Sequence, residues 1–376
     1  MYYIEKFVPL RYGKYDLEKV DISKVLGKQM RYASCGKAAL YHCLLSLGLK
    51  AGDKVLVPNY ICSSVLVPIK KIGLTPVFYD INESDLNANI DSIKNLFVKD
   101  TTIKALLVAS MYGNPAALDS IEQFCHENHL FLIDDAAQSL GAKIGNRYVG
   151  TFGDAGFFSF SPGKATPGHL GAFYWTSNNN YIISMKNHYL YHIASYWSYY
   201  YNRYEIYRYK NSLLGRFTKY LELIARKYTN FWCDDVNSFE RPILGGILYE
   251  NFRQSFRKEF SSDFAETFDS NEYFKVVTQG AKDTNNHKLV ILCKTRNIAL
   301  SISRLFEEKG VCTINGYSLL DERADTPVAL DIEKRVIEIP LENDSEKYKF
   351  IVQCLQYFIE YQKELIEKQN GITSSI

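Results

Sequence analysis

The chain has 376 residues, 47% of them hydrophobic, which is enough apolar material for a large core in two domains. Lys plus Arg number 44 and Asp plus Glu number 42, so the net charge of +2 gives no electrostatic case for nucleic acid or an anionic membrane. The sequence shows neither a signal peptide nor an apolar run of bilayer length, so we expect a cytoplasmic protein without membrane insertion. Eight cysteines without a C-x-x-C pair indicate reduced, mostly buried thiols.

The first half of the chain alternates short apolar runs with helical patterns. Residues 37–47 carry apolar side chains at helical spacing, and Gly48 is a plausible stop. Runs rich in β-branched residues follow at 54–58, 76–81, 103–110 and 130–134, with helical stretches such as 116–129 between them. Because near-continuous apolar strands alternate with helices, this half predicts an α/β fold with a mostly parallel sheet between helices. Two further runs, 155–160 and 171–176, predict a hairpin-like pair that closes one edge of the sheet.

The composition changes from about residue 180. Residues 189–209 hold nine tyrosines, and 212–228 has the pattern of an amphipathic helix. We therefore predict a large domain over 1–238 that includes a tyrosine-rich helical segment at 180–235.

The remaining residues, 239–376, predict a smaller α+β domain at the carboxyl terminus. Its helical patterns lie at 297–309 and 346–364, and a strand-like run lies at 335–340.

The segment Ser34-Cys35-Gly36-Lys37 opens the helix predicted at 37–47. A helix N-terminus offers free backbone N–H groups and the positive end of the helix dipole, so it can bind phosphate. Gly36 lets a ligand approach the backbone closely, and Lys37 adds a full positive charge. The same pattern is also typical of an ordinary helix cap followed by an exposed lysine, and this segment alone leaves both interpretations open.

Asp134, Asp135 and Gln138 lie at the carboxyl end of a predicted strand. Ligands of open α/β sheets bind outside the carboxyl ends of the strands. A carboxylate there can hold a heterocyclic nitrogen in its protonated form, as the electron-sink ring of pyridoxal 5'-phosphate (PLP) requires. The alternative is a carboxylate that caps a helix or orders a loop, and physical reasoning alone does not choose between the two aspartates.

Ser159 and Lys164 follow the next predicted strand. A hydroxyl at a strand end can bind phosphate, and a lysine in a partly desolvated site has a lowered pKa and can act as a nucleophile. Gly163-Lys164 resembles the end of a P-loop, but Phe158 stands where that pattern needs Gly and Ala165 where it needs Ser or Thr. The P-loop interpretation therefore fails.

Together these segments resemble the DegT/DnrJ/EryC1/StrS family of PLP-dependent sugar aminotransferases, which have the aspartate-aminotransferase fold type I. The resemblance covers about 150 residues and then fades between about 180 and 235. It rests on order and spacing as well as on the lysine. The similar stretches are Gly48–Pro58 to "G-[IL]-x-x-G-D-E-V-[IL]-V-P", Pro76–Ile81 to "PVFVDI", Tyr112–Pro115 to "YGNP", Ile133–Gln138 to "IEDAAQ", and Gly150–Lys164 to "G-x-x-G-D-x-x-x-F-S-F-x-x-x-K".

The resemblance implies a role for each matching residue. Lys164 is implied to be the catalytic lysine that bonds PLP covalently, and Asp135 to face the pyridine nitrogen. Gln138 falls where a Gln or His lies by the ring and its phenolic oxygen. The phosphate position matches Ser159 and the backbone of Gly36 and Lys37.

Three further positions differ from the family pattern or match it weakly. Cys62 falls where many members stack an aromatic side chain on the ring, and Tyr60 is a candidate to compensate. Asn237 is a weak match to an Asn that reaches the cofactor of the neighbouring subunit. The turn His169–Ala172 replaces a glycine-rich turn.

The family resemblance implies an enzyme that moves an amino group, in most of the family from glutamate, to a nucleotide-linked keto-sugar. The product would serve surface polysaccharide or secondary-metabolite synthesis, and the protein would be a homodimer with PLP as cofactor. Alternatives are a PLP- or PMP-dependent sugar dehydratase on the same fold, whose members have His at the lysine position, or a catalytically silent regulatory relative. His188 and His192 lack an evident third ligand, so we expect no metal site.

The tyrosine-rich segment has two interpretations of its own. Tyr196, Tyr200, Tyr204 and Tyr207 fall on one helical face, which is typical of packing into a core or a dimer interface. The functional hypothesis is an aromatic cover over the sugar site.

Overall fold

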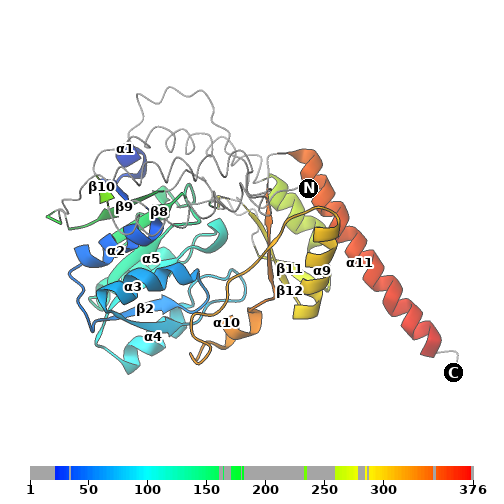
Figure 1. Cartoon of the computed structure of the whole chain (residues 1–376), viewed down its shortest axis with the longest axis horizontal. Coiled ribbons are helices and arrows are strands. Elements are labelled where there is room, and N and C mark those ends of the chain that lie inside the picture. Colours follow the sequence, from blue (N-terminus) through cyan, green and yellow to red (C-terminus); the bar gives the residue numbers. More distant parts are fainter. Residues whose placement is uncertain are drawn as a thin grey trace, which may run out of the picture.

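A computed structural model of the whole chain shows a large α/β body and a smaller second unit from which one long helix extends (Figure 1). The structure describes residues 22–33, 35–160, 164, 171–178, 180–181, 233–234, 259–277, 284–285, 288–341 and 344–373. The tyrosine-rich segments 189–209 and 212–228 lie outside these residues, and so do Ser34 and Asn237.

Eight strands form the central sheet of the large body, in the order β10-β1-β9-β8-β5-β4-β2-β3. Their bounds are β1 (Arg31–Ala33), β2 (Lys54–Pro58), β3 (Thr75–Tyr79), β4 (Ile103–Ala109), β5 (Phe131–Asp135), β8 (Ala155–Ser159), β9 (Ala172–Thr176) and β10 (Cys233–Asp234). The pairs among β3, β2, β4, β5 and β8 are parallel. This half of the sheet confirms the mostly parallel arrangement predicted from the apolar runs.

The predicted hairpin-like pair exists, but it does not close the sheet. β8 and β9 pair antiparallel, from Ala155 opposite Thr176 to Ser159 opposite Ala172. β1 then pairs with β9, and β10 with β1, so two short strands lie beyond the pair. The prediction that this pair closes one edge of the sheet was wrong. A strand of three residues, such as Arg31–Ala33, is too short to show an alternation of apolar and polar side chains in the sequence.

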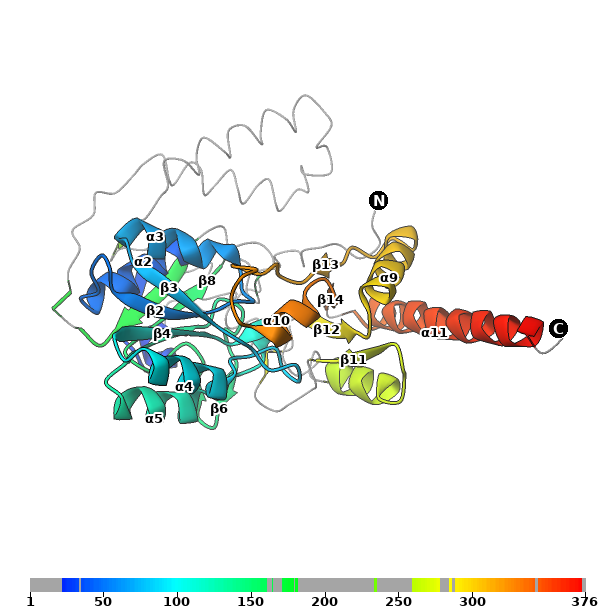
Figure 2. The same ribbon diagram turned by 90° about the horizontal axis from the view of Figure 1, so that it is seen from below.

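Helices cover both faces of this sheet, as Figure 2 shows. α2 (Gly36–Ser46) and α3 (Leu66–Ile72) lie on one face, and α4 (Ile90–Lys99) and α5 (Leu118–Glu127) lie on the other. Each face has its own buried apolar cluster, with Leu40 and Leu44 of α2 in the first and Ile93 and Ile121 in the second. Strands buried on both faces explain why their sequences are apolar throughout rather than alternating. The remaining described elements of this body are α1 (Ile22–Leu26), the short helical turns Ser63–Val65 and Met111–Gly113, and the hairpin β6 (Lys143–Ile144) with β7 (Arg147–Tyr148).

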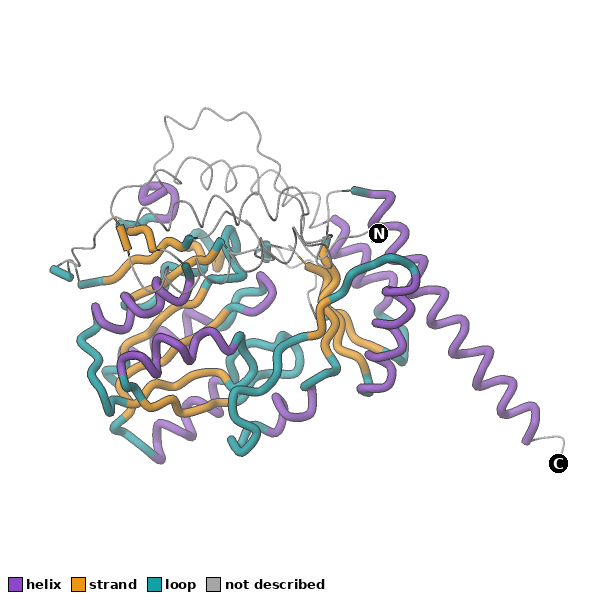
Figure 3. The backbone as a smooth tube through the Cα atoms, in the orientation of Figure 1, coloured by secondary structure: helices purple, strands orange, loops and turns teal. Residues whose placement is uncertain are grey.

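The second unit is a four-stranded antiparallel sheet in the order β11-β12-β14-β13, seen as a separate group of strands in Figure 3. Its elements are β11 (Phe274–Val276), β12 (Lys288–Cys293), α9 (Arg296–Glu308), β13 (Ile314–Asn315), α10 (Pro327–Ile332), β14 (Val336–Pro340) and α11 (Ser345–Thr373), with a further helix at 259–268. This arrangement matches the predicted small α+β domain. The boundary predicted at 238/239 falls outside the described residues and stays a prediction.

Two polar side chains of the large body hold the segment between β13 and β14. Asn59 follows β2, and its side chain bonds Leu320, Asp321 and Thr326. Asp80 follows β3, and its two oxygens accept the N–H groups of Val328 and Ala329 at the start of α10, each at 2.9 Å. The small sheet is therefore attached at the carboxyl edge of the parallel strands, where a ligand site is expected.

Across the described part of the chain, no helix is both long enough and apolar enough to cross a membrane. Seven cysteines of that part are free thiols: Cys35, Cys43, Cys62, Cys125, Cys293, Cys312 and Cys354.

Candidate active site

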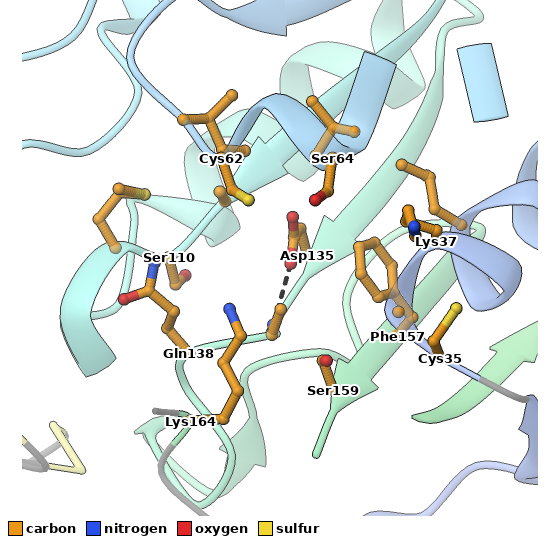
Figure 4. Close-up of a pocket in the computed structure, with 17 residues that line it drawn as sticks. Cys35, Lys37, Cys62, Ser64, Ser110, Asp135, Gln138, Phe157, Ser159 and Lys164 are labelled. Atoms are coloured by element: carbon orange, nitrogen blue, oxygen red, sulfur yellow. Dashed lines mark hydrogen bonds between the residues drawn. The ribbon is translucent and has the colours of Figure 1, made fainter. Parts of the chain in front are cut away.

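A cavity of about 200 Å³ lies beyond the carboxyl ends of β2, β4 and β5 and beside the start of α2. Side chains from all these elements converge on it (Figure 4). Seven of the eight residues predicted from the sequence line this one cavity, although they span the chain from Gly36 to Lys164. They are Gly36, Lys37, Cys62, Asp135, Gln138, Ser159 and Lys164. The eighth, Asn237, lies outside the described residues.

Lys164 is half-buried and lines this cavity together with Asp135, which is almost fully buried. Burial lowers the pKa of the Lys164 ammonium, and the nearby Asp135 carboxylate opposes this shift. Burial likewise raises the pKa of Asp135 to about 6, and its hydrogen bond from Ala137 N, at 2.9 Å, works in the other direction. Desolvation therefore favours the uncharged amine of Lys164 more than in a solvent-exposed lysine, as a nucleophilic lysine requires.

The structure separates the roles of the two adjacent aspartates. Asp134 faces away from the cavity, because successive side chains of a strand point to opposite faces. Its Oδ2 accepts the backbone N–H groups of Gly150 and Phe152, at 2.6 and 3.1 Å. Asp134 therefore orders the loop before β8, whereas Asp135 lines the cavity. Of the two aspartates, Asp135 is the one placed to face a ligand in the cavity.

The opposite end of the cavity is formed by the start of α2 and by Ser159. Cys35 is extended before the helix and provides no side-chain cap, so the first N–H groups of α2 keep their capacity to bind an anion. A Cβ on Gly36 would lie 3.1 Å from Ser159 Oγ, which shows how closely β8 approaches the helix here. Lys37 lines the same end and adds a positive charge. These groups fit a phosphate.

Gln138 and Cys62 lie between the two ends of the cavity. Gln138 Nε2 donates to Tyr317 Oη at 3.0 Å, while Gln138 Oε1 is buried without a hydrogen-bond partner among the described residues. Cys62 lines the cavity, but Tyr60 does not; its ring packs edge-on against Tyr317 of the small sheet's segment. Tyr60 therefore holds the two domains together and does not replace an aromatic at position 62.

Sequence reasoning missed the groups behind the cavity wall. Asn285 is fully buried and donates to the carbonyls of Gln138 and Leu140, which anchors the turn after β5. A Cβ on Gly113 would overlap the Asn285 side chain, so the turn after β4 needs glycine there. Ser110, which follows β4, also lines the cavity and was not predicted from the sequence. No local pattern marks Asn285 or Tyr317.

Together, the cavity and its residues fit PLP, because an amine, a carboxylate and a phosphate cradle face one enclosed space. Residues 23–197 match the model of the DegT/DnrJ/EryC1/StrS aminotransferase family. The likeness covers a little under half of the chain. GDP-perosamine synthase of Vibrio cholerae is 31% identical over 170 residues, which are 45% of this chain and 45% of that protein. The match thus spans less than half the length of the curated relative.

Two solved structures resemble almost the whole chain in fold. An aminotransferase of the DegT/DnrJ/EryC1/StrS family from Brucella abortus has a TM-score of 0.67 at 20% identity and covers 93% of this chain and 92% of its own. Escherichia coli GDP-4-keto-6-deoxy-D-mannose-3-dehydratase with bound hydrated PLP has a TM-score of 0.65 at 18% identity. It covers 92% of this chain and 98% of its own. These likenesses confirm the predicted fold class. In the described residues, no group of three or more His, Cys, Asp or Glu is arranged to hold a metal ion.

Proposed function

We propose that this protein is a PLP-dependent aminotransferase that moves an amino group, from glutamate, to a nucleotide-linked keto-sugar. The observation that carries the proposal is Lys164, whose pKa is lowered by desolvation, in one cavity with Asp135 and the phosphate cradle of α2. A lysine desolvated beside a carboxylate in a cavity is typical of a nucleophilic lysine rather than of a structural one.

The residues divide the work between holding the cofactor and moving protons. Ser159, Lys37 and the start of α2 would bind the phosphate, and Asp135 would hold a proton on the ring nitrogen. PLP, when bound, supplies an aldehyde for the amino group and a ring that withdraws electrons from the adjacent carbon. Lys164 Nζ, whose neutral form is favoured by desolvation, would accept a proton from the α-carbon of the amino donor and return it to an atom next to that carbon.

The reaction balances without a further reagent. Glutamate loses its amino group and becomes 2-oxoglutarate, and the ketone of the sugar becomes an amine. The nucleotide-sugar substrate is supported by the GDP-sugar names of the V. cholerae synthase and the E. coli dehydratase. A role in polysaccharide synthesis, a cytoplasmic location and a homodimer belong to the same proposal and rest on the family.

The covalent bond to Lys164 tests the proposal. The purified protein should be yellow, and borohydride treatment should fix PLP on the peptide that contains Lys164. Lys164→Ala should still bind PLP through the phosphate cradle and Asp135, while transamination falls by at least about 10⁴-fold because the nucleophile and the proton carrier are both lost. Recovery of the adduct on another lysine, or near-normal turnover by Lys164→Ala, would refute the assignment.

A screen of nucleotide keto-sugars with glutamate, read by mass spectrometry, separates the proposal from the dehydratase alternative. An aminotransferase replaces the carbonyl by an amine and accumulates 2-oxoglutarate in equal amount. A dehydratase removes a hydroxyl and leaves a carbonyl on the product. Lys164 at the position where those dehydratases have His favours the first outcome.

A further inference from the structure

Gln138 has one side-chain atom that the described structure leaves unsatisfied. Its residue is only 7% exposed, and Oε1 has no hydrogen-bond partner among the described residues, while Nε2 donates to Tyr317 Oη at 3.0 Å. Leaving a buried acceptor without a partner costs about 1–3 kcal/mol, so native proteins rarely do it without a reason. Since Gln138 lines the cavity, a bound ligand can supply the reason.

The Tyr317 hydroxyl can either accept a hydrogen bond from the Gln138 carboxamide or donate one to it, because a hydroxyl does both. A half-turn of the Gln138 carboxamide exchanges its two ends. Tyr317 Oη would then donate to Oε1, and Nε2 would present its N–H groups to the cavity. Burial raises the pKa of Tyr317 well above its usual value, so its hydroxyl keeps the proton that this arrangement needs.

Tyr317 is held from both domains. Its N–H donates to Tyr60 Oη at 3.1 Å, and its ring stacks on Tyr112 with centroids 6.2 Å apart. Tyr60 Oη and Tyr112 Oη are themselves hydrogen-bonded at 3.1 Å. On the other side, Gly316 N donates to Val336 O of β14 at 3.0 Å. The hydroxyl of Tyr317 is thus fixed beside Gln138 only when the small sheet is docked.

We propose that Tyr317 is a positioning residue, which donates to Gln138 Oε1 and thereby turns the carboxamide N–H groups toward an anionic ring oxygen in the cavity. The inference rests on the proposed function, because PLP carries such an oxygen on its ring. It gives the small domain a direct part in setting the electronic state of the cofactor, through one hydrogen bond at the domain junction.

Tyr317→Phe tests the inference, with Tyr112→Phe as the matched control that removes a hydroxyl from the same aromatic cluster. Tyr317→Phe should shift the absorption maximum of the bound PLP and lower kcat about tenfold, with little change in KM for the sugar. Tyr112→Phe should keep the wild-type spectrum and kcat, whatever its effect on thermal stability. An unshifted spectrum with wild-type kcat in Tyr317→Phe would overturn the inference.

Two variants of Gln138 show whether Tyr317 acts through it. Gln138→Glu keeps acceptors for Tyr317 but places no donor in the cavity, so it should reproduce the spectral shift of Tyr317→Phe. In a Gln138→Ala background, Tyr317→Phe should add nothing to the shift or to the loss of kcat. Additive losses would overturn the inference about Tyr317 and leave the proposed function standing. A wild-type protein that binds no PLP at Lys164 would instead overturn the proposed function, and this inference with it.

Discussion

Asp134 and Asp135 are neighbours in the chain but serve different parts of the structure. Asp135→Asn should bind PLP with a shifted spectrum and lose at least about 10²-fold in kcat, because an amide cannot hold the proton on the ring nitrogen. Asp134→Asn should stay within about threefold of wild-type kcat, since its amide oxygen can still accept from Gly150 and Phe152. Steady-state kinetics of the pair measure the contrast, and equal losses in both variants would contradict the assignment.

The Asp134→Asn variant also gives a pH test of burial. Burial raises the pKa of Asp134 from 3.8 to about 7, so the folded protein binds this proton more tightly than the unfolded chain. The carboxyl's contribution to stability therefore falls as the pH rises from about 4 to 7, and is smallest above pH 7. Asp134→Asn removes this dependence. In urea unfolding without PLP, we expect the free energy of unfolding of the wild type to fall between pH 5 and pH 8 by roughly 2 kcal/mol more than that of Asp134→Asn. Parallel pH profiles would contradict the prediction.

Among individual residues, the sequence predicted seven that line the cavity but none of those that orient them. Lys164, Asp135 and Ser159 follow strand ends, where a simple rule for parallel sheets places ligands. The choice of Asp135 over Asp134 needed the family resemblance, since both follow the same apolar run. Tyr317 was not predictable, because its role arises from a contact with Gln138 across 179 positions of sequence.

Among the elements, the small sheet has an ion pair on the face that meets the large domain. Lys288 of β12 and Glu338 of β14 are hydrogen-bonded and almost fully buried. Val290, Leu292 and Val336, which alternate with the small domain's own core residues, join the apolar cluster of the large domain. Because successive side chains of a strand point to opposite faces, Lys288 and Glu338 point toward the large domain, as these three residues do.

Removing one partner of this pair should be much worse than removing both. Lys288→Met leaves Glu338 buried without its cation and should lower the free energy of unfolding by about 3–5 kcal/mol. The double variant Lys288→Met with Glu338→Leu should recover most of that loss, because an apolar pair carries no desolvation cost. Urea melts of the three proteins measure this, and a double variant no more stable than Lys288→Met would contradict it.

Elements with a long apolar or helical pattern were predictable, and short ones were not. β2, β4 and α9 lie close to the ranges read from the sequence. β1 and β13 have only three and two residues, and their pairing depends on partners far away in the chain. Such strands are defined by tertiary hydrogen bonds, so no local pattern can reveal them.

For the whole molecule, we expect a homodimer in which both subunits are needed for full activity. The expectation rests on the family and on the weak match of Asn237 to a residue that reaches the partner's cofactor. Sedimentation of the purified protein should give twice the chain mass, and specific activity should fall on dilution below the dimer dissociation constant. A monomer with full activity would end this expectation.

The attachment of the small domain through Asn59 also has a consequence for how the protein is made. The side chain of Asn59 bonds Asp321 and Thr326, partners that lie 262 and 267 positions later. A ribosome therefore releases the whole parallel sheet, with Lys164, long before the segment that covers its carboxyl edge. During that interval the apolar residues Tyr60 and Tyr112 are without their cover, which exposes the nascent chain to aggregation and makes it a client for chaperones. The cofactor cavity is completed only near the end of synthesis.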